Sequence, residues 1–185
     1  MTLFTEHSYS RVMVFIDYRN VYESTKFLGD DVRLDLYRLT QILVASRDLV
    51  GAYVFDARKR IPDKNDTTLA THDRLREQGF RVIARESLVY RENKVEQKEV
   101  DVSLACEMLE HALLNHYDVA IVVSGDRDFV PAIQRVQAAG KRVEVAAFED
   151  VYNDECKRAA DVYYILDKLP IMSMSSSEDD EGVGY

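Results

Sequence analysis

The stretch Ile121–Ile133, IVVSGDRDFVPAI, contains an apolar run that stops abruptly at a serine, a glycine and an aspartate. The β-branched residues that precede this stop are typical of a strand buried on both faces. Asp126 and Asp128 then place two carboxylates directly beyond the end of the strand. Because burying an unpaired charge is unfavourable, these carboxylates must either face solvent or face a bound cation.

The length and composition fit one ordinary globular domain. The chain has 185 residues, of which 46% are hydrophobic and 31% are charged. The first ten residues lack the basic start and apolar stretch of a signal peptide. The apolar runs are far shorter than the roughly 20 residues that a membrane span needs. The spacing of Cys106 and Cys156 indicates neither a metal-ligand pair nor a disulfide framework. We therefore expect a cytoplasmic protein.

The charge is unevenly distributed along the chain. A net charge of −9 argues weakly against a partner that is itself a polyanion. However, the segment SSSEDDEG near the C-terminus carries four of the carboxylates, whereas residues 56–100 hold eleven Lys or Arg against nine Asp or Glu. Nucleic acid therefore remains a possible partner.

Short apolar segments alternate with segments of helical periodicity. Strands are predicted at residues 11–17, 49–57, 80–85, 119–124 and 141–148, with an extra strand at 162–166. Helices are predicted at residues 34–46, 67–79, 100–116, 129–140 and 153–161. Residues 87–99 are interpreted as a hairpin or loop excursion. This alternation predicts an α/β fold, a three-layer Rossmann-like sandwich with a mostly parallel central sheet.

Two further expectations concern boundaries and buried faces. The domain is expected to span residues 11–170, with an N-terminal extension at 1–10 and an acidic, disordered tail at 171–185. Leu69 and Leu75 are predicted to face inward from the helix at 67–79. In the helix at 100–116 the predicted buried stripe consists of Val102, Ala105, Leu109 and Ala112 or Leu113.

Two of the predicted strands end in aspartate. Asp17 ends the first strand, and Asp126 follows the fourth. Ligands of such sheets bind beyond the carboxyl ends of the strands, where the strand order reverses. If these two strands are neighbours, their aspartates meet at that point.

Asp101, at the start of the predicted helix at 100–116, adds a further carboxylate to Asp17, Asp126 and Asp128. Each of the acids at a helix start has a simpler interpretation, because an aspartate there also caps the helix. All four together are harder to explain in this way, since two carboxylates about 4 Å apart repel by roughly 4 kcal/mol at an effective dielectric near 20. Hard oxygen ligands without a matching His or Cys set indicate Mg²⁺ or Mn²⁺.

A divalent cation in an acidic site is suited to phosphodiester hydrolysis. Motifs of rival chemistries (GxGxxG, GxxxxGK[ST], GxSxG and HExxH) are missing from the sequence. A phosphatase of the haloacid dehalogenase type would need a second aspartate two residues after the first, and Arg19 occupies that position. The four histidines show no usable spacing, and we expect them at the surface: His7, His72, His111 and His116.

Three motifs resemble those of NYN domains, in the LabA-like branch of the PIN-like nuclease superfamily. VFIDYRNVY resembles the first strand of the family, KEVDVSLACEML resembles its acidic helix, and VVSGDRDFVPAIQRVQAAGKRVEV resembles its SGD-containing block. All three occur in the family order between about Arg11 and Leu166. The resemblance implies the strand order 3-2-1-4-5 and a metal-dependent ribonuclease site. The chain departs from the family at Glu107, where aspartate is frequent, and at Glu99, which replaces the usual glycine.

The resemblance also implies a role for individual residues. Asp17 would be the first metal-binding acid, Asp101 the second, and Asp126 and Asp128 the third and fourth. Asn20 would orient a water molecule or the substrate phosphate.

The remaining implied roles are supporting ones. Ser124 would support the metal shell with its hydroxyl, and Gly125 would let the backbone approach the ligand closely. Lys98 would contact a phosphate, although an exposed lysine without such a role is an equally good interpretation.

RNA is the expected substrate, in single-stranded or loop regions. Such RNA is held by basic grooves and by aromatic faces. The segment DARKRIPDK supplies Arg58, Lys59 and Arg60, and is expected to form a loop at the same edge as the acids. A solvated loop without any RNA contact is the alternative interpretation of this segment.

Two functions therefore compete. The first is a Mg²⁺- or Mn²⁺-dependent ribonuclease, which the full set of acids favours. The second is a non-catalytic module that binds RNA or protein through the same fold, which the net negative charge and the acidic tail favour. A homodimer is compatible with either function.

Overall fold

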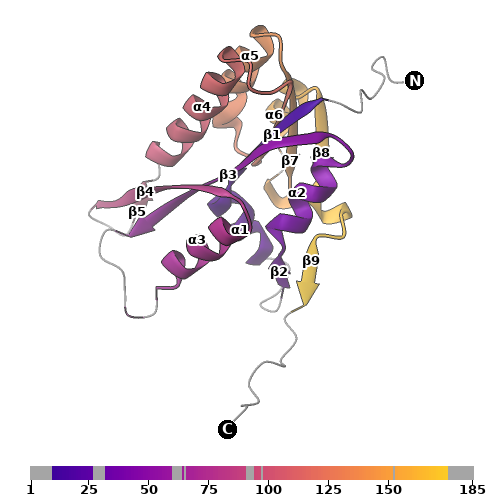
Figure 1. Cartoon of the computed structure of the whole chain (residues 1–185). Helices are drawn as coiled ribbons and strands as arrows, with labels where there is room; N and C mark the ends of the chain where they lie inside the picture. Colours follow the sequence, from indigo (N-terminus) through magenta and orange to yellow (C-terminus); the bar gives the residue numbers. More distant parts are fainter. Residues whose placement is uncertain are drawn as a thin grey trace.

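The computed structural model describes residues 10–26, 32–59, 64, 66–90, 94–96, 98–151 and 153–174 (Figure 1). Nine strands lie within them: β1 (Arg11–Asp17), β2 (Val32–Leu34), β3 (Asp48–Lys59), β4 (Arg81–Tyr90), β5 (Lys94–Glu96), β6 (Val119–Val123), β7 (Arg142–Ala147), β8 (Val162–Ile165) and β9 (Met172–Met174). The α-helices of the described residues are α1 (Tyr18–Lys26), α2 (Leu36–Val44), α3 (Thr68–Glu77), α4 (Lys98–Leu113), α5 (Val130–Ala138) and α6 (Asp154–Ala159).

The described strands form one large sheet in the order β5-β4-β3-β1-β6-β7-β8. All neighbours pair in parallel except β5, which forms an antiparallel hairpin with β4. The six parallel strands, numbered along the chain, have the order 3-2-1-4-5-6. The predicted fold, including the extra C-terminal strand, is therefore confirmed, and the excursion at residues 87–99 includes a hairpin.

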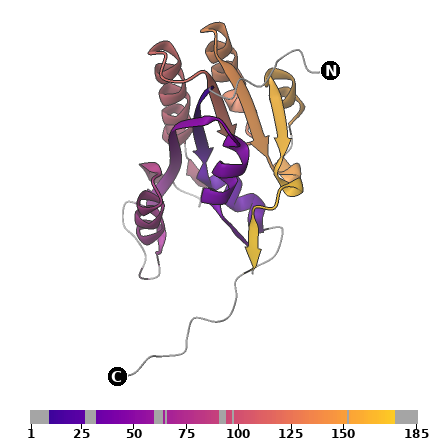
Figure 2. The same cartoon turned by 45° about the vertical axis from the view of Figure 1, so that its right-hand side comes forward.

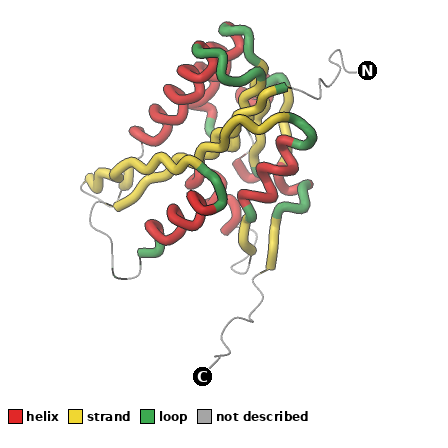
Figure 3. The backbone as a smooth tube through the Cα atoms, in the orientation of Figure 1, coloured by secondary structure: helices red, strands yellow, loops and turns green. Residues whose placement is uncertain are grey.

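Helices cover both faces of the sheet (Figure 3). On one face, Val12, Val14 and Ile16 of β1 pack in a core with residues of α1, α2 and α3. On the other, Met13 and Phe15 pack in a core with residues of α4 and α5. Alternate residues of a strand face opposite sides of a sheet, so β1 contributes to both cores. Its residues Val12–Asp17 are consequently all buried.

A small antiparallel sheet lies beside the large one. β2 pairs with β9, which carries the end of the described chain away from the domain (Figure 2). Ile171, just before β9, is fully buried in the core with α2. The paired backbone thus continues to Met174, four residues beyond position 170.

The structure corrects two predictions about buried faces. Leu69 is 57% exposed, and only Leu75 of the predicted pair is buried. In α4 the buried stripe is Val100, Leu104, Met108 and Ala112, whereas Val102 and Leu113 are exposed. Ala112 was predicted correctly, but the phase of the predicted stripe was wrong, because α4 carries apolar residues on several faces and more than one helical phase fits the sequence.

The strand β3 is longer than predicted. It continues to Lys59, and its last residues pair with Arg85–Ser87 of β4. The residues after Ala57 were expected to form a loop, but Arg58 and Lys59 belong to the sheet. Across the residues that the structure describes, no helix has the length and apolarity needed to cross a membrane.

Candidate active site

Asp17 ends the central strand β1 and is 5% exposed. One carboxylate oxygen accepts the backbone N–H of Asn20, at 3.2 Å, and the other accepts the hydroxyl of Ser124, also at 3.2 Å. The first bond is that of a helix-capping aspartate, because α1 begins at the next residue. The second joins β1 to the end of β6, its neighbour in the sheet.

The loop after β6 is held by Ser124 and Asn20. The Ser124 hydroxyl, on a side chain that is almost fully buried, also accepts the backbone N–H of Asp126 at 3.2 Å. The side-chain oxygen of Asn20 accepts the N–H of Gly125 at 3.0 Å. Asp126 in turn accepts the N–H of Asp128 at 2.9 Å and caps a short 3₁₀ turn. The structure therefore brings these predicted site residues together.

Packing within the fold leaves no room for a side chain at Gly125. A β-carbon added there would lie 2.3 Å from the carbonyl oxygen of Val151, closer than any side chain tolerates. The Gly125 backbone was predicted to approach a ligand closely. In the structure it closely approaches the backbone of Val151 instead. The sequence alone contains no signal for that contact, because the two residues meet only through the fold.

Cys156, from α6, was not expected to serve the site. Its buried thiol contacts the carbonyl oxygens of Asp126, at 3.3 Å, and of Gly125, at 3.7 Å. Burial, together with the charge of Asp126, raises the pKa of this thiol to about 11, so it remains protonated and can donate. Cys156 thus supports the loop that carries Asp126.

The four acids act on one another electrostatically. Burial raises the pKa of Asp17 to about 6, and the charges of Asp101 and Asp126 add to the rise, which the bonds from Asn20 and Ser124 oppose. The pKa of Asp101, half-buried in the first turn of α4, is raised by burial and then by Asp126 and Asp128. Such mutual repulsion is what a cation would relieve.

A hard divalent cation prefers ligands of the kind that the four acids offer: Asp17, Asp101, Asp126 and Asp128. They offer carboxylate oxygens, and a buried carboxylate with a raised pKa gains most from a positive charge. At the same time, within the described parts of the chain, no three His, Cys, Asp or Glu side chains are grouped so that they could hold a metal ion. A bound cation would therefore have to draw the carboxylates closer together.

Of the four predicted basic residues, only Arg58 has its side chain among the described parts of the chain. Arg58 lies on β3, three residues beyond Phe55, the residue that pairs with Asp17. The guanidinium of Arg58 is 3.6 Å from the carboxylate of Glu86 on β4. Arg60 and the side chain of Lys59 lie outside the described residues. Lys98 is the first residue of α4, and its side chain also lies outside the description.

A buried pair that the sequence analysis missed lies at the carboxyl end of the sheet. His72 of α3 is 1% exposed, and its Nε2 is 2.8 Å from the carboxylate of Asp56, which is also buried. The expectation that this histidine lies at the surface was wrong. No spacing links the two residues, because α3 returns along the sheet before they meet.

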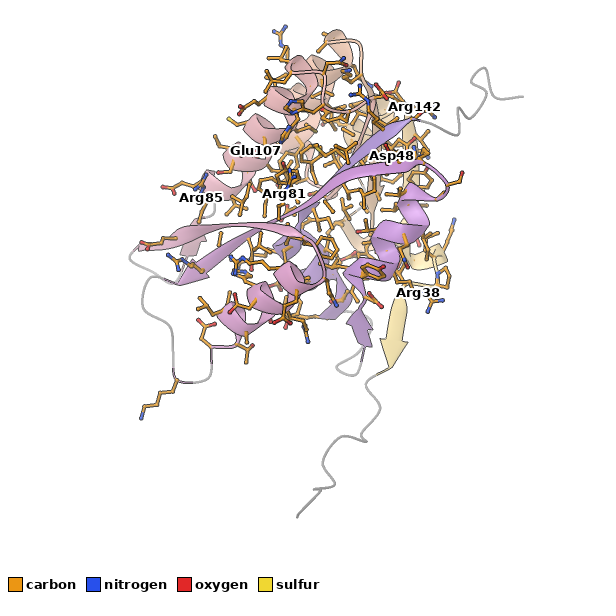
Figure 4. The ribbon with its side chains drawn as sticks, in the orientation of Figure 1. Arg38, Asp48, Arg81, Arg85, Glu107 and Arg142 are labelled. Carbon is orange, nitrogen blue, oxygen red and sulfur yellow. The ribbon has the colours of Figure 1, made fainter. Side chains whose placement is uncertain are left out.

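Glu107 of α4 lies near Arg81, at the start of β4 (Figure 4). Its carboxylate is 3.5 Å from Nε2 of His111, which also contacts the hydroxyl of Tyr53 at 2.7 Å. Arg81 donates to the same hydroxyl. Burial lowers the pKa of His111, so that this histidine is neutral in most of the physiological range. Glu107 therefore belongs to a separate polar cluster.

Comparisons with known proteins give a family and a fold. The NYN domain family matches residues 11–167. No curated protein matches the chain. A crystal structure of a protein of unknown function from Vibrio parahaemolyticus is similar, with a TM-score of 0.72 and 22% identity over 89% of this chain and 98% of that one. At this identity the likeness concerns the fold alone.

Proposed function

Because the chain belongs to the NYN domain family, within the PIN-like nuclease superfamily, we propose that it is a divalent-metal-dependent ribonuclease. NYN domains generally act on RNA, and those of the nuclease type generally depend on a divalent metal. The observation that carries the proposal is the buried carboxylate of Asp17 at the end of β1, which Ser124 joins to the loop that carries Asp126. Burial and the charges of Asp101 and Asp126 raise the pKa of this carboxyl. Keeping such repelling carboxylates together is unfavourable for the fold alone, and this arrangement is common at sites of function.

The chain's own residues would hold and orient the reacting groups. Asp17, Asp101, Asp126 and Asp128 would bind Mg²⁺ or Mn²⁺, which supplies charge neutralisation at the phosphate and a water of lowered pKa. Ser124 and the N–H of Asn20 fix the Asp17 carboxylate.

The side chain of Asn20 has a separate role in this proposal. Its side-chain oxygen fixes Gly125, so the amide nitrogen of the same side chain is available to the substrate phosphate or to a water molecule. This agrees with the role that the resemblance implied. Lys98, at the start of α4, remains a candidate phosphate contact.

The test is cleavage of an end-labelled, partly structured RNA in Mg²⁺, in Mn²⁺ and in EDTA. Cleavage is expected only with metal, and Asp126→Asn should lower the rate about a hundredfold or more, because even indirect support of a metal ligand contributes about 10- to 100-fold. The matched control is Asp73→Asn, an exposed acid on α3 that pairs with Arg76 and lies outside the proposed site. Equal rates for wild type and Asp126→Asn would reject the proposal.

The alternative is a binding module of the same fold without catalysis. One observation favours it: among the described residues no three potential ligands are grouped for a metal. Such a protein would bind RNA or another protein with little dependence on Mg²⁺. Tight RNA binding without cleavage in either metal would establish this alternative.

A further inference from the structure

The first helix after Asp17 presents a column of three side chains. Tyr18, Tyr22 and Lys26 lie four residues apart on α1, so they share one face of the helix. The rings of the two tyrosines are stacked, with centroids 5.8 Å apart and planes 10° apart. The ammonium of Lys26 lies over the ring of Tyr22, 4.8 Å from its centre.

The three residues of the column differ in burial and in their contacts. Tyr18 is partly buried and packs against the core beneath α1. Tyr22 is 49% exposed although it has a rigid neighbour on one side. Lys26 is exposed and also pairs with the exposed Glu23 at 3.0 Å. Exposed pairs of this kind contribute little stability, so Lys26 can move off the ring readily.

The column adjoins the candidate active site. It starts at the residue after Asp17, and Asn20, which bonds to Gly125, lies in its first turn. Four helical residues span about 6 Å, so the ring of Tyr22 lies only one turn further along α1 than that of Tyr18. A chain that entered the acidic site along α1 would pass over this ring.

The charge around the column suits a polyanion. Arg74, exposed on α3, acts on Tyr18 and opposes the rise in its pKa that burial and Asp56 cause. Two of the nearby acids are paired, Glu23 with Lys26 and Asp56 with His72, and the acids of the candidate site would be neutralised by the proposed metal ion. Single-stranded RNA is commonly bound by stacking bases on aromatic rings and by placing cations near its phosphates.

We propose that the exposed ring of Tyr22 stacks on a base of single-stranded RNA beside the acidic site, and that Lys26 contacts an RNA phosphate. This inference rests on the proposed function and adds to it two residues of α1 that would hold the RNA. A duplex keeps its bases stacked inside, so it offers the ring no base. The site therefore selects unpaired RNA.

The test measures binding of a labelled ten-nucleotide uridine RNA by fluorescence anisotropy, with Ca²⁺ in place of Mg²⁺. Tyr22→Leu should weaken binding at least fivefold, since stacking contributes about 1–3 kcal/mol per base. Tyr22→Phe should retain the affinity of the wild type. Lys26→Ala should lower the slope of log affinity against log salt by about one.

Two controls make the test specific. Tyr37→Leu removes a tyrosine that is also 49% exposed, but on α2, and should leave binding unchanged. An oligonucleotide of abasic sites should bind weakly and show no effect of Tyr22→Leu. Wild-type binding that Tyr22→Leu leaves intact would overturn the stacking role alone. Absence of both RNA binding and RNA cleavage by the wild type would overturn this inference and the proposed function together.

Discussion

At the scale of the residue, Asp17 combines a structural role with the metal-binding role proposed for it. Its carboxylate caps α1 and accepts the Ser124 hydroxyl, yet burial and two nearby acids raise its pKa to about 6. An acid whose pKa is higher in the folded state binds protons more tightly there than in the unfolded state. Its charged form therefore opposes folding, and this effect develops as the pH rises from about 4 to about 6.

Asp17→Asn is expected to stabilise the protein at pH 7.5 and to have little effect at pH 4. A rise in pKa of about two units corresponds to roughly 3 kcal/mol in the free energy of unfolding. Urea unfolding of wild type and variant in EDTA at both pH values measures the difference. A variant that is less stable than the wild type at pH 7.5 would show that the lost bonds outweigh the removed charge.

Gly125→Ala is expected to destabilise the fold, because its β-carbon would lie 2.3 Å from the Val151 carbonyl oxygen. Overpacking of this kind typically costs about 1–3 kcal/mol. Gly51→Ala is the matched control, since the closest atom to its β-carbon would be 3.5 Å away, an ordinary contact. Thermal unfolding of both variants checks the prediction, which fails if their midpoints are equal.

At the scale of the element, the sequence predicted the type and order of most strands and helices but missed α1, β2 and β9. It predicted the buried faces and the lengths of the elements less well. Alternation of strand and helix patterns is a local signal, so β1, α4 and β6 were predicted near their observed positions. The buried face of α4 depends on which apolar side chains meet the sheet, and several faces of that helix are apolar. The length of β3 depends on its pairing with β4, which no local pattern records.

Leu104→Ala is expected to lower the free energy of unfolding by about 2–5 kcal/mol, because Leu104 is fully buried between α4 and the sheet. Val102→Ala should change it by less than about 0.5 kcal/mol, since Val102 is 60% exposed. Chemical denaturation of the two variants distinguishes the observed stripe from the predicted one. A larger loss of unfolding free energy for Val102→Ala than for Leu104→Ala would show that α4 buries the face predicted from the sequence.

At the scale of the whole molecule, short crossovers between parallel strands restrict the possible topologies to a few, and the acids at strand ends then converge at one edge. On this ground Asp17 and Asp126 were expected to meet if their strands were neighbours. The resemblance to NYN domains implied that strand order and added Asn20 and Ser124 to the site. Cys156 and the contact of Val151 with Gly125 could not be predicted, because they arise where α6 and the turn before it fold back over the loop.

A buried ion pair joins distant parts of the fold. Arg47, after α2, donates two hydrogen bonds to Glu144 of β7, at 2.9 and 3.0 Å, and Glu144 is almost fully buried. Removing one partner leaves the other charge poorly compensated, so Arg47→Ala should lower the free energy of unfolding by about 3 kcal/mol. The loss should persist in 0.5 M salt, because buried pairs are weakly screened.

The exposed pair of Arg76 and Asp73 provides the control for this prediction. Arg76→Ala should leave the unfolding free energy nearly unchanged at any salt concentration. Urea unfolding at low and high salt measures both variants. If Arg47→Ala proves as mild as Arg76→Ala, then Arg142 and Tyr164, which also contact Glu144, suffice to hold that carboxylate.

The central position of β1 in the sheet has a consequence for the nascent chain during translation. Asp17 is made early, but the serine that holds its carboxylate follows 107 residues later in the chain. Domains begin to fold from the N-terminus while the ribosome is still working. Until β6 has emerged, β1 has β3 but not β6 as a partner strand, and Asp17 lacks both the hydroxyl of Ser124 and the carboxylate of Asp126. Under the proposed ribonuclease function, the messenger under translation would thus be protected from cleavage until β6 and the loop after it have been synthesised.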